Sequence, residues 1–253
     1  MSLVESVRTR AAPYGLNLVA AAPAQRYDRR VRPELRCSTQ APDARSVVLV
    51  GNGGRALWQA LIRHAAGKPG WWQRAHPLDD FISGVVEAEL LPALDGACVG
   101  MVYPFSTTPV RLDFIELARA VGLGGPSLLG VLVHPVFGPW IAFRAALLLA
   151  AELDAPGPAL GFDPCSGCAS RSCIAACPVA AVTYPEGWSV GSCSRFRIEH
   201  EATCNPGCHA RLGCVLAPEH RYTADELAYH QRRALGVMRD YLGGPGAPSL
   251  ERP

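Results

Sequence analysis

Eight of the ten cysteines in this 253-residue chain fall between Cys165 and Cys214. The segment that carries them has no long apolar run, so about fifty residues cannot build an ordinary hydrophobic core. Something other than apolar packing must hold this part together. Charges fall throughout the N-terminal residues, where a signal peptide needs an apolar stretch, so we expect a cytoplasmic protein. In that compartment dense cysteines are more often metal ligands than disulfides.

The first four of these cysteines form the pattern C-x2-C-x4-C-x3-C-P, and the proline that ends it is Pro178. In bacterial ferredoxins with two clusters, the first three thiolates of such a run bind one cluster and the fourth binds the other. Pairs of the C-x2-C type also suit tetrahedral zinc. The short last spacing and the proline favour iron and sulfide, so the pattern predicts a ferredoxin-like domain.

Eight thiolates match the ligands of two 4Fe–4S clusters. Following the crossed ligation of ferredoxins, we expect one cluster on Cys165, Cys168, Cys173 and Cys214, and the other on Cys177, Cys193, Cys204 and Cys208. His200 and His209 could each replace a thiolate, although surface or structural roles suit them better. Two such clusters store and pass single electrons, so they would need an acceptor, and the N-terminal domain is the first place to look for one.

The N-terminal part alternates strand-like and helix-like segments. Apolar, β-branched runs predict strands at 45–51, 97–105 and 128–135, and helical spacing predicts helices at 53–65, 77–94 and 112–125. Residues 140–149 fit either structure. The alternation indicates an α/β domain with a central sheet. Cys98 lies in an apolar run and is expected to be a small buried hydrophobe.

Composition changes near residue 155, where a connector rich in proline and glycine begins. We therefore expect three parts, at 1–155, 156–220 and 221–253. The last part should be a helix, with Thr223 as N-cap and Glu226 at the capping-box position, followed by a disordered tail.

The charge balance argues against two classes of partner. The net charge is +2, from 24 basic and 22 acidic side chains, so electrostatics give no reason to expect nucleic acid or a membrane surface. No apolar stretch reaches the roughly 20 residues of a membrane-spanning helix. The turn at 51–55 could meet an anion but lacks the P-loop and dinucleotide patterns, so no nucleotide is predicted.

Four stretches occur here in the order seen in epoxyqueuosine reductases: residues 43–51, residues 112–149, the cysteine–proline pattern and "CSRFRIEH" at 193–200. The chain resembles that family, in which a cobalamin-binding, nitroreductase-like domain precedes a two-cluster ferredoxin domain, and to which reductive dehalogenases are related. Residues 130–149 and 218–230 also resemble CblC-type cobalamin-processing proteins. The resemblance covers about residues 44–230.

The resemblance implies an α+β protein: a nitroreductase-like α/β sheet domain with a cobalamin-binding role, a loop-rich bacterial-ferredoxin-like di-cluster domain and a C-terminal helix. The residues that it places near a corrinoid are Gly122, Gly124, Gly125, His134, Phe137, Gly138 and Trp140. Glycines would let the backbone approach a large macrocycle. Each residue also has a structural alternative, such as a helix cap, a turn or the core. Because the D-x-H-x-x-G motif is absent, the corrinoid is expected without an axial protein histidine.

Two departures from these families bear on activity. Ser106 occupies the place of an aspartate that is the proposed proton donor in epoxyqueuosine reductases, and serine is a poor general acid near neutral pH. Asp113 lies nearby but suits a helix start better. Arg221 matches an arginine position of CblC-type proteins that contacts glutathione, whereas Ser127 stands where a second arginine is expected. Neither the tRNA reaction nor thiol-dependent dealkylation is therefore predicted.

These observations lead to one main hypothesis and two alternatives. The main one is an iron–sulfur oxidoreductase that passes electrons from a ferredoxin- or flavodoxin-type donor through two clusters to a bound cobalamin. The first alternative is an electron carrier or corrinoid chaperone without an organic substrate. The second is a ferredoxin-like protein whose corrinoid pocket has degenerated. No catalytic residue is assigned.

Overall fold

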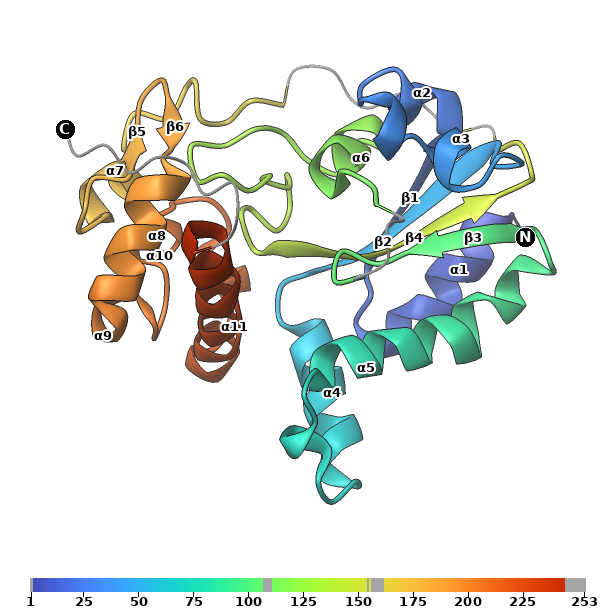
Figure 1. Ribbon diagram of the computed structural model, residues 1–253, viewed down its shortest axis with the longest axis horizontal. Coiled ribbons are helices and arrows are strands. Elements are labelled where there is room, and N and C mark those ends of the chain that lie inside the picture. The colour runs from blue at the N-terminus through green and yellow to red at the C-terminus, as the bar shows by residue number, and fades with distance from the viewer. Residues whose placement is uncertain (1, 107–110, 154, 156–161, 244–253) are drawn as a thin grey trace. The chain divides into compact units, whose positions relative to one another are not determined.

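The computed structural model describes residues 2–106, 111–153, 155 and 162–243. The chain divides into two compact units (Figure 1). The first comprises residues 1–125 and 141–162, and the second comprises residues 126–140 and 163–253. The sequence predicts boundaries near residues 155 and 220, whereas the structure groups residues 126–140 with the cysteine-rich part.

The first unit is built on a four-stranded sheet with the strand order β1-β2-β4-β3. Its strands are β1 (Leu18–Pro23), β2 (Ser46–Gly53), β3 (Cys98–Val102) and β4 (Ile141–Leu149), and all neighbours are antiparallel. The two inner strands, β2 and β4, carry long apolar runs, and residues 47–50 and 145–149 are buried. A run that is buried on both faces is expected of an inner strand covered on each side.

Helices cover both faces of this sheet, with α2, α3 and α6 on one side and α1, α4 and α5 on the other (Figure 1). Their bounds are α1 Leu3–Ala11, α2 Ala24–Asp28, α3 Cys37–Gln40, α4 Ala56–Ala66, α5 Pro77–Val85 and α6 Phe114–Ala120. Short 3-10 turns lie at η1 Ala12–Tyr14, η2 Pro33–Leu35, η3 Trp71–Gln73 and η5 Pro92–Leu94, and a π-helical turn, η4, spans Val86–Leu90.

Several expected elements differ from the structure. The predicted helix at 77–94 is divided into α5, η4 and η5, and Pro92, which has no N–H to donate, begins the last of these turns. The segment 140–149, for which the sequence left strand and helix open, forms strand β4 from Ile141 to Leu149. The strand predicted at 128–135 is wrong, because the described backbone there is irregular apart from isolated bridge residues at Val133 and His134, the second of which pairs with Gly138. Strand β1 was not anticipated.

The start of α6 is fixed by a network around Tyr27. Asp113 is the N-cap of α6, and its carboxylate accepts hydrogen bonds from the N–H groups of Ile115 and Glu116, at 3.0 Å each. The N–H of Asp113 donates to the Tyr27 hydroxyl at 2.8 Å, and that hydroxyl donates to the Leu35 carbonyl at 3.0 Å. Asp113 thus has the helix-starting role that its sequence context favours.

The second unit consists of short elements and one long helix. Its helices are α7 Ser172–Ala176, α8 Val190–Glu199, α9 Glu201–Cys204, α10 His209–Leu212, the 3-10 turn η6 Pro218–His220 and α11 Ala224–Gly243. Strands β5 (Val182–Thr183) and β6 (Gly187–Trp188) form a small hairpin. The Thr223 hydroxyl accepts a hydrogen bond from the Glu226 N–H at 3.3 Å, as the predicted N-cap requires. The predicted tail after residue 243 lies outside the described residues.

The described interior of the second unit includes two small apolar groups. One is formed by Leu128, Val182 and Ala210, and several cysteines pack against it. The other is formed by Trp140, Tyr222 and Leu227. Each group therefore takes one member from residues 126–140, which explains why this segment belongs to the cysteine-rich unit.

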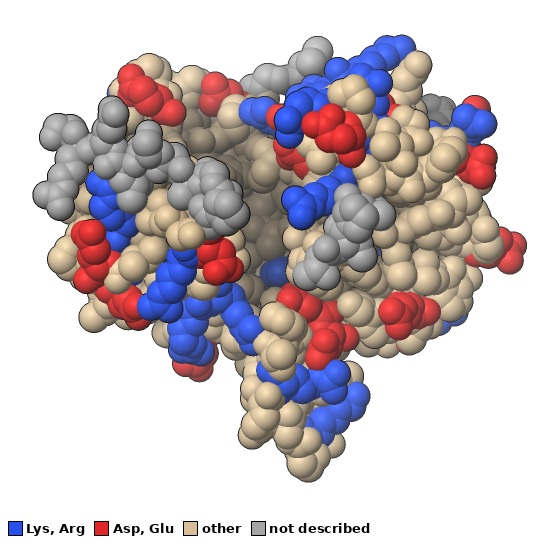
Figure 2. Space-filling model, viewed as in Figure 1, with Lys and Arg blue, Asp and Glu red and all other residues tan. Residues whose placement is uncertain are grey.

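The surface is mixed in charge, since acidic and basic side chains are interspersed on the face shown in Figure 2. This distribution agrees with the small net charge of the sequence. Over the described parts of the chain, none of the helices combines the length and apolar content needed to cross a membrane.

Replacing Tyr27 with phenylalanine tests the network at the start of α6. Tyr27 is fully buried, and Tyr27→Phe leaves the half-buried Asp113 and Leu35 without two hydrogen bonds; at about 0.5–1.5 kcal/mol for each bond, the expected loss in unfolding free energy is about 1–3 kcal/mol. Tyr14→Phe is the matched control, because the Tyr14 hydroxyl donates to the half-buried Glu89. Denaturant unfolding should show a smaller loss for Tyr14→Phe; equal losses would contradict the assigned role.

The division of the chain predicts how fragments behave. A fragment of residues 163–243 lacks Leu128 and Trp140, so it should show no cooperative unfolding even after treatment with iron and sulfide. Joining residues 126–140 to its N-terminus through a flexible linker should restore a cooperative transition, measured by circular dichroism. Identical behaviour of the two fragments would show that residues 126–140 are dispensable for this unit.

Candidate metal centre

Two separate cavities in the second unit are each lined by four cysteines. The larger, of about 190 Å³, is lined by Cys177, Cys193, Cys204 and Cys208. The smaller, of about 40 Å³, is lined by Cys165, Cys168, Cys173 and Cys214. These groups have the same members as the two ligand sets derived from the sequence pattern. That they bind metal stays a prediction.

The smaller cavity is formed by a turn, a short helix and a distant loop. The Cys168 N–H donates to the Cys165 carbonyl at 3.3 Å, which closes the turn that carries the first two thiols. Cys173 lies in α7, and Cys214 follows α10. The Ser172 hydroxyl donates to the Gly213 carbonyl at 2.6 Å, so α7 is tied to the residue before Cys214.

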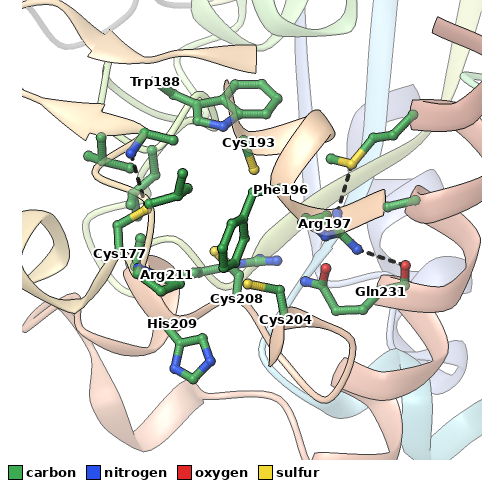
Figure 3. Close-up of a pocket in the computed structure, with 18 of the residues that line it drawn as sticks. Cys177, Trp188, Cys193, Phe196, Arg197, Cys204, Cys208, His209, Arg211 and Gln231 are labelled. Atoms are coloured by element: carbon green, nitrogen blue, oxygen red, sulfur yellow. Dashed lines mark hydrogen bonds between the residues drawn. The ribbon is translucent and has the colours of Figure 1, made fainter. Parts of the chain in front are cut away.

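The larger cavity takes each thiol from a different element (Figure 3). Cys177 directly follows α7, Cys193 lies in α8, Cys204 ends α9 and Cys208 precedes α10. The Ala181 N–H donates to the Cys177 sulfur at 3.3 Å, so this sulfur already receives a backbone hydrogen bond. Figure 3 shows Trp188 and Phe196 beside the thiols. The aromatic rings make this cavity largely apolar.

The donor set suits a cluster better than a single ion. All ten cysteines are free thiols. Among the residues that the structure describes, no three Cys, His, Asp or Glu side chains converge closely enough for one metal ion. The eight thiols instead surround two voids, as thiolates do around an iron–sulfur cluster.

Burial controls the protonation of these thiols. It raises the pKa of Cys173 and Cys214, and neighbouring thiols of the same cavity raise it further. Burial also raises the pKa of Cys193 and Cys204, again with a contribution from thiols of their own cavity. These cysteines are therefore protonated at neutral pH when free, and binding a metal would release their protons.

The two histidines near the cysteines have structural contacts. His200 packs its ring against Phe196, with centroids 4.7 Å apart. His209 lines the larger cavity, but its Nε2 lies 2.8 Å from the Thr203 carbonyl. These contacts agree with the structural roles that the sequence favours for both residues.

Three of the residues predicted near a corrinoid lie in the first unit and follow α6. Gly122 has a φ of 78° just after the helix, and its N–H donates to the Arg119 carbonyl, so it ends α6. Gly124 lies two residues further along. At Gly125 a Cβ would lie 1.9 Å from the Phe162 carbonyl oxygen. The chain's own backbone therefore requires glycine at position 125.

The other four predicted residues lie in the second unit. The backbones of His134 and Gly138 exchange two hydrogen bonds of 2.8 Å, and Nδ1 of His134 accepts from the Val136 N–H at 3.1 Å. His134 is thus a turn residue, and burial lowers its pKa. Phe137 packs edge-on against His220 at 4.8 Å.

Trp140 is fully buried, and its ring packs against Tyr222 with centroids 5.5 Å apart. At Gly138, a Cβ would lie 2.7 Å from the Leu216 carbonyl oxygen. The seven residues are therefore divided between the two units, and the described contacts of six of them, all but Gly124, give them structural roles. The corrinoid pocket stays a prediction.

The residues that depart from the related families also have local partners. Ser106 follows β3, and its hydroxyl accepts a hydrogen bond from the Tyr103 N–H at 3.4 Å. The Ser127 hydroxyl donates to the Val131 carbonyl at 2.5 Å. Arg221 donates to the Leu212 carbonyl at 2.8 Å and so supports the loop before Cys214.

Sequence reasoning did not single out Arg197, which lines the larger cavity with four of the thiols. The stretch "CSRFRIEH" contains two arginines, Arg195 and Arg197, and the pattern alone does not distinguish them. Helical spacing offered one signal, since Arg197 lies four residues after Cys193 and hence on the same face of a helix.

Comparisons with known proteins give similarity in structure only. No family model matches the sequence, and no curated protein matches it. A C. elegans B12-trafficking protein, CblC, is 12% identical with a TM-score of 0.55, and the match covers all of both chains. An epoxyqueuosine reductase solved with a modified tRNA stem loop is 14% identical with a TM-score of 0.52, over 87% of this chain and 66% of that one.

The catabolic reductive dehalogenase NpRdhA, in complex with 3-bromo-4-hydroxybenzoic acid, is 17% identical with a TM-score of 0.53. The match covers 93% of this chain and 36% of the dehalogenase. The chain thus spans about two thirds of the reductase and about a third of the dehalogenase. At these identities the matches concern architecture. This protein therefore has the mixed α/β fold of epoxyqueuosine reductase, CblC and reductive dehalogenase, as the resemblance in its sequence predicts.

Proposed function

We propose that this protein is an iron–sulfur redox protein that carries two 4Fe–4S clusters and uses them in cobalamin chemistry. The observation that carries the proposal is the division of eight thiols into two cavities of four. The crossed order of the ligands along the chain is that of bacterial ferredoxins with two clusters.

The chain's own residues would hold and shield the clusters. Each cavity supplies four sulfur donors, and the short helices α7 and α10 place a donor of each cavity at or next to their ends. The apolar rings of Trp188 and Phe196 line the larger cavity and would face a cluster held there. A cluster would supply one-electron storage and transfer at each position.

The cobalamin link rests on the family resemblance and on the neighbours in structure. One neighbour is a B12-trafficking protein. The epoxyqueuosine reductases that the sequence resembles join a cobalamin-binding domain to two clusters, in the same order along the chain. A corrinoid would then accept electrons from the clusters, and an external donor of ferredoxin or flavodoxin type would supply them.

A second candidate function is an electron carrier without a corrinoid. Gly125 and Trp140 favour it, because neither residue requires a corrinoid. The Phe162 carbonyl explains why residue 125 is glycine, and Trp140 packs in an apolar group of the interior. One neighbour was solved with a tRNA stem loop. A nucleic-acid substrate therefore belongs among the candidates to be tested, although Ser106 offers no carboxyl group as proton donor.

Iron and sulfide analysis tests the clusters directly. The anaerobically reconstituted protein should contain about eight iron and eight sulfide per chain. Cys165→Ala and Cys177→Ala should each abolish one cluster, and a different one, so their electron paramagnetic resonance spectra should differ. Cys98→Ala removes a thiol that lines neither cavity and should retain all the iron. A colourless protein saturated with zinc would contradict the proposal.

Cobalamin titration separates the two candidate functions. If the corrinoid proposal holds, adding the loaded protein to cobalamin should shift its visible absorption bands. Phe137→Ala should weaken binding about tenfold or more, as expected for loss of a buried aromatic contact. Val136→Ala changes an exposed neighbour and serves as the control. Unchanged bands in every oxidation state would favour the electron carrier.

A further inference from the structure

Arg197 differs from the other basic residues in the described part of the chain because it alone is buried. It is 5% exposed, and it lies in α8, four residues after Cys193. Burying a guanidinium removes it from water, which is unfavourable unless an opposite charge or a full set of acceptors compensates it.

The protein's own contacts of Arg197 provide little compensation. Nη1 donates to the Met238 sulfur at 3.1 Å, and Nη2 donates to the Gln231 carbonyl at 2.9 Å. Thioethers are weak acceptors. Within the described residues Nε is buried without a hydrogen-bond partner, and no carboxylate forms an ion pair with this side chain. The positive charge therefore lacks a protein counter-charge.

The position of Arg197 indicates what could compensate it. Arg197 lines the larger cavity together with Cys177, Cys193, Cys204 and Cys208. Figure 3 shows it beside Cys193 and Cys204, with hydrogen bonds that lead away from the thiols toward α11.

The other arginines at the cavities differ from Arg197. Arg211 also lines the larger cavity, but its guanidinium donates to the Pro139 carbonyl and lies 4.8 Å from the Trp140 ring. Arg171 lines the smaller cavity, and its Nε is also buried without a hydrogen-bond partner among the described residues, but the side chain is only half-buried and its guanidinium lies 3.5 Å from the Tyr184 ring. Water screens a half-buried charge more than a buried one.

We propose that Arg197 raises the reduction potential of the cluster held by Cys177, Cys193, Cys204 and Cys208. The inference rests on the proposed function, because it requires that cluster. When an external donor gives the cluster one electron, its net charge becomes one unit more negative and no bond is broken. A buried positive charge nearby stabilises this reduced form more than the oxidised form, and the low local dielectric strengthens the effect.

The test is a redox titration of the loaded protein under anaerobic conditions, followed by electron paramagnetic resonance with dithionite as reductant. In Arg197→Met one of the two cluster transitions should move to lower potential. We expect at least about a tenfold fall in the ratio of reduced to oxidised cluster at a fixed potential, which is about 59 mV for a one-electron couple. The other transition should not move.

Three further variants separate charge from structure. Arg195→Met removes a charge from the same helix outside the cavity lining and should move neither transition. Met238→Leu removes one hydrogen-bond acceptor but keeps the charge, and should also have no effect. Arg197→Lys keeps the charge, so its ratio of reduced to oxidised cluster at a fixed potential should stay within about threefold of the wild-type ratio. This variant also tests the role of the charge if Arg197→Met loads iron poorly.

The inference is overturned if Arg197→Met holds eight iron and titrates as wild type does. It is also overturned if Met238→Leu or Arg197→Lys shifts a transition as far as the predicted effect of Arg197→Met, because the hydrogen bonds would then matter rather than the charge. A wild-type protein that binds no iron overturns the proposed function and this inference together, so the two failures are distinguishable.

Discussion

The convergence of eight thiols on two cavities is the constraint that shapes the second unit. Its described interior includes two apolar groups of three buried residues each. The space between its short helices is occupied by thiols that face two cavities. If these thiols bind clusters as proposed, the binding would contribute to the folding free energy of this unit.

The first unit is held together differently. Strands β2 and β4 bury long apolar runs between two layers of helices, so ordinary hydrophobic packing accounts for its stability (Figure 1). Local polar contacts such as those of Tyr27 then fix where individual helices begin. The chain thus combines a sheet with an extended apolar core and a unit in which thiols surround two cavities.

The sequence predicted those features that depend on local pattern. The apolar run at β2, the N-cap of α11 and the grouping of the cysteines into two sets all follow from spacing and residue type. Features set by distant contacts could not be predicted. Glycine is required at position 125 because the carbonyl of Phe162, distant in the sequence, approaches it. Residues 126–140 were predicted to belong to the sheet domain because they are apolar, but they pack in the second unit. The sequence does not distinguish Arg197 from Arg195, whereas the fold places only Arg197 of the two in the lining of the larger cavity.

The assignment of residues 126–140 to the second unit has a consequence for how such a protein can change in evolution. The chain passes from one unit to the other near residues 125, 140 and 162, so neither unit is encoded by one uninterrupted stretch. A recombination event with a single breakpoint at the connector would transfer the cysteines without Leu128 and Trp140, which complete the two apolar groups around them. The cysteine-rich part is therefore not a cassette that can be exchanged on its own, and the two units are expected to be inherited together.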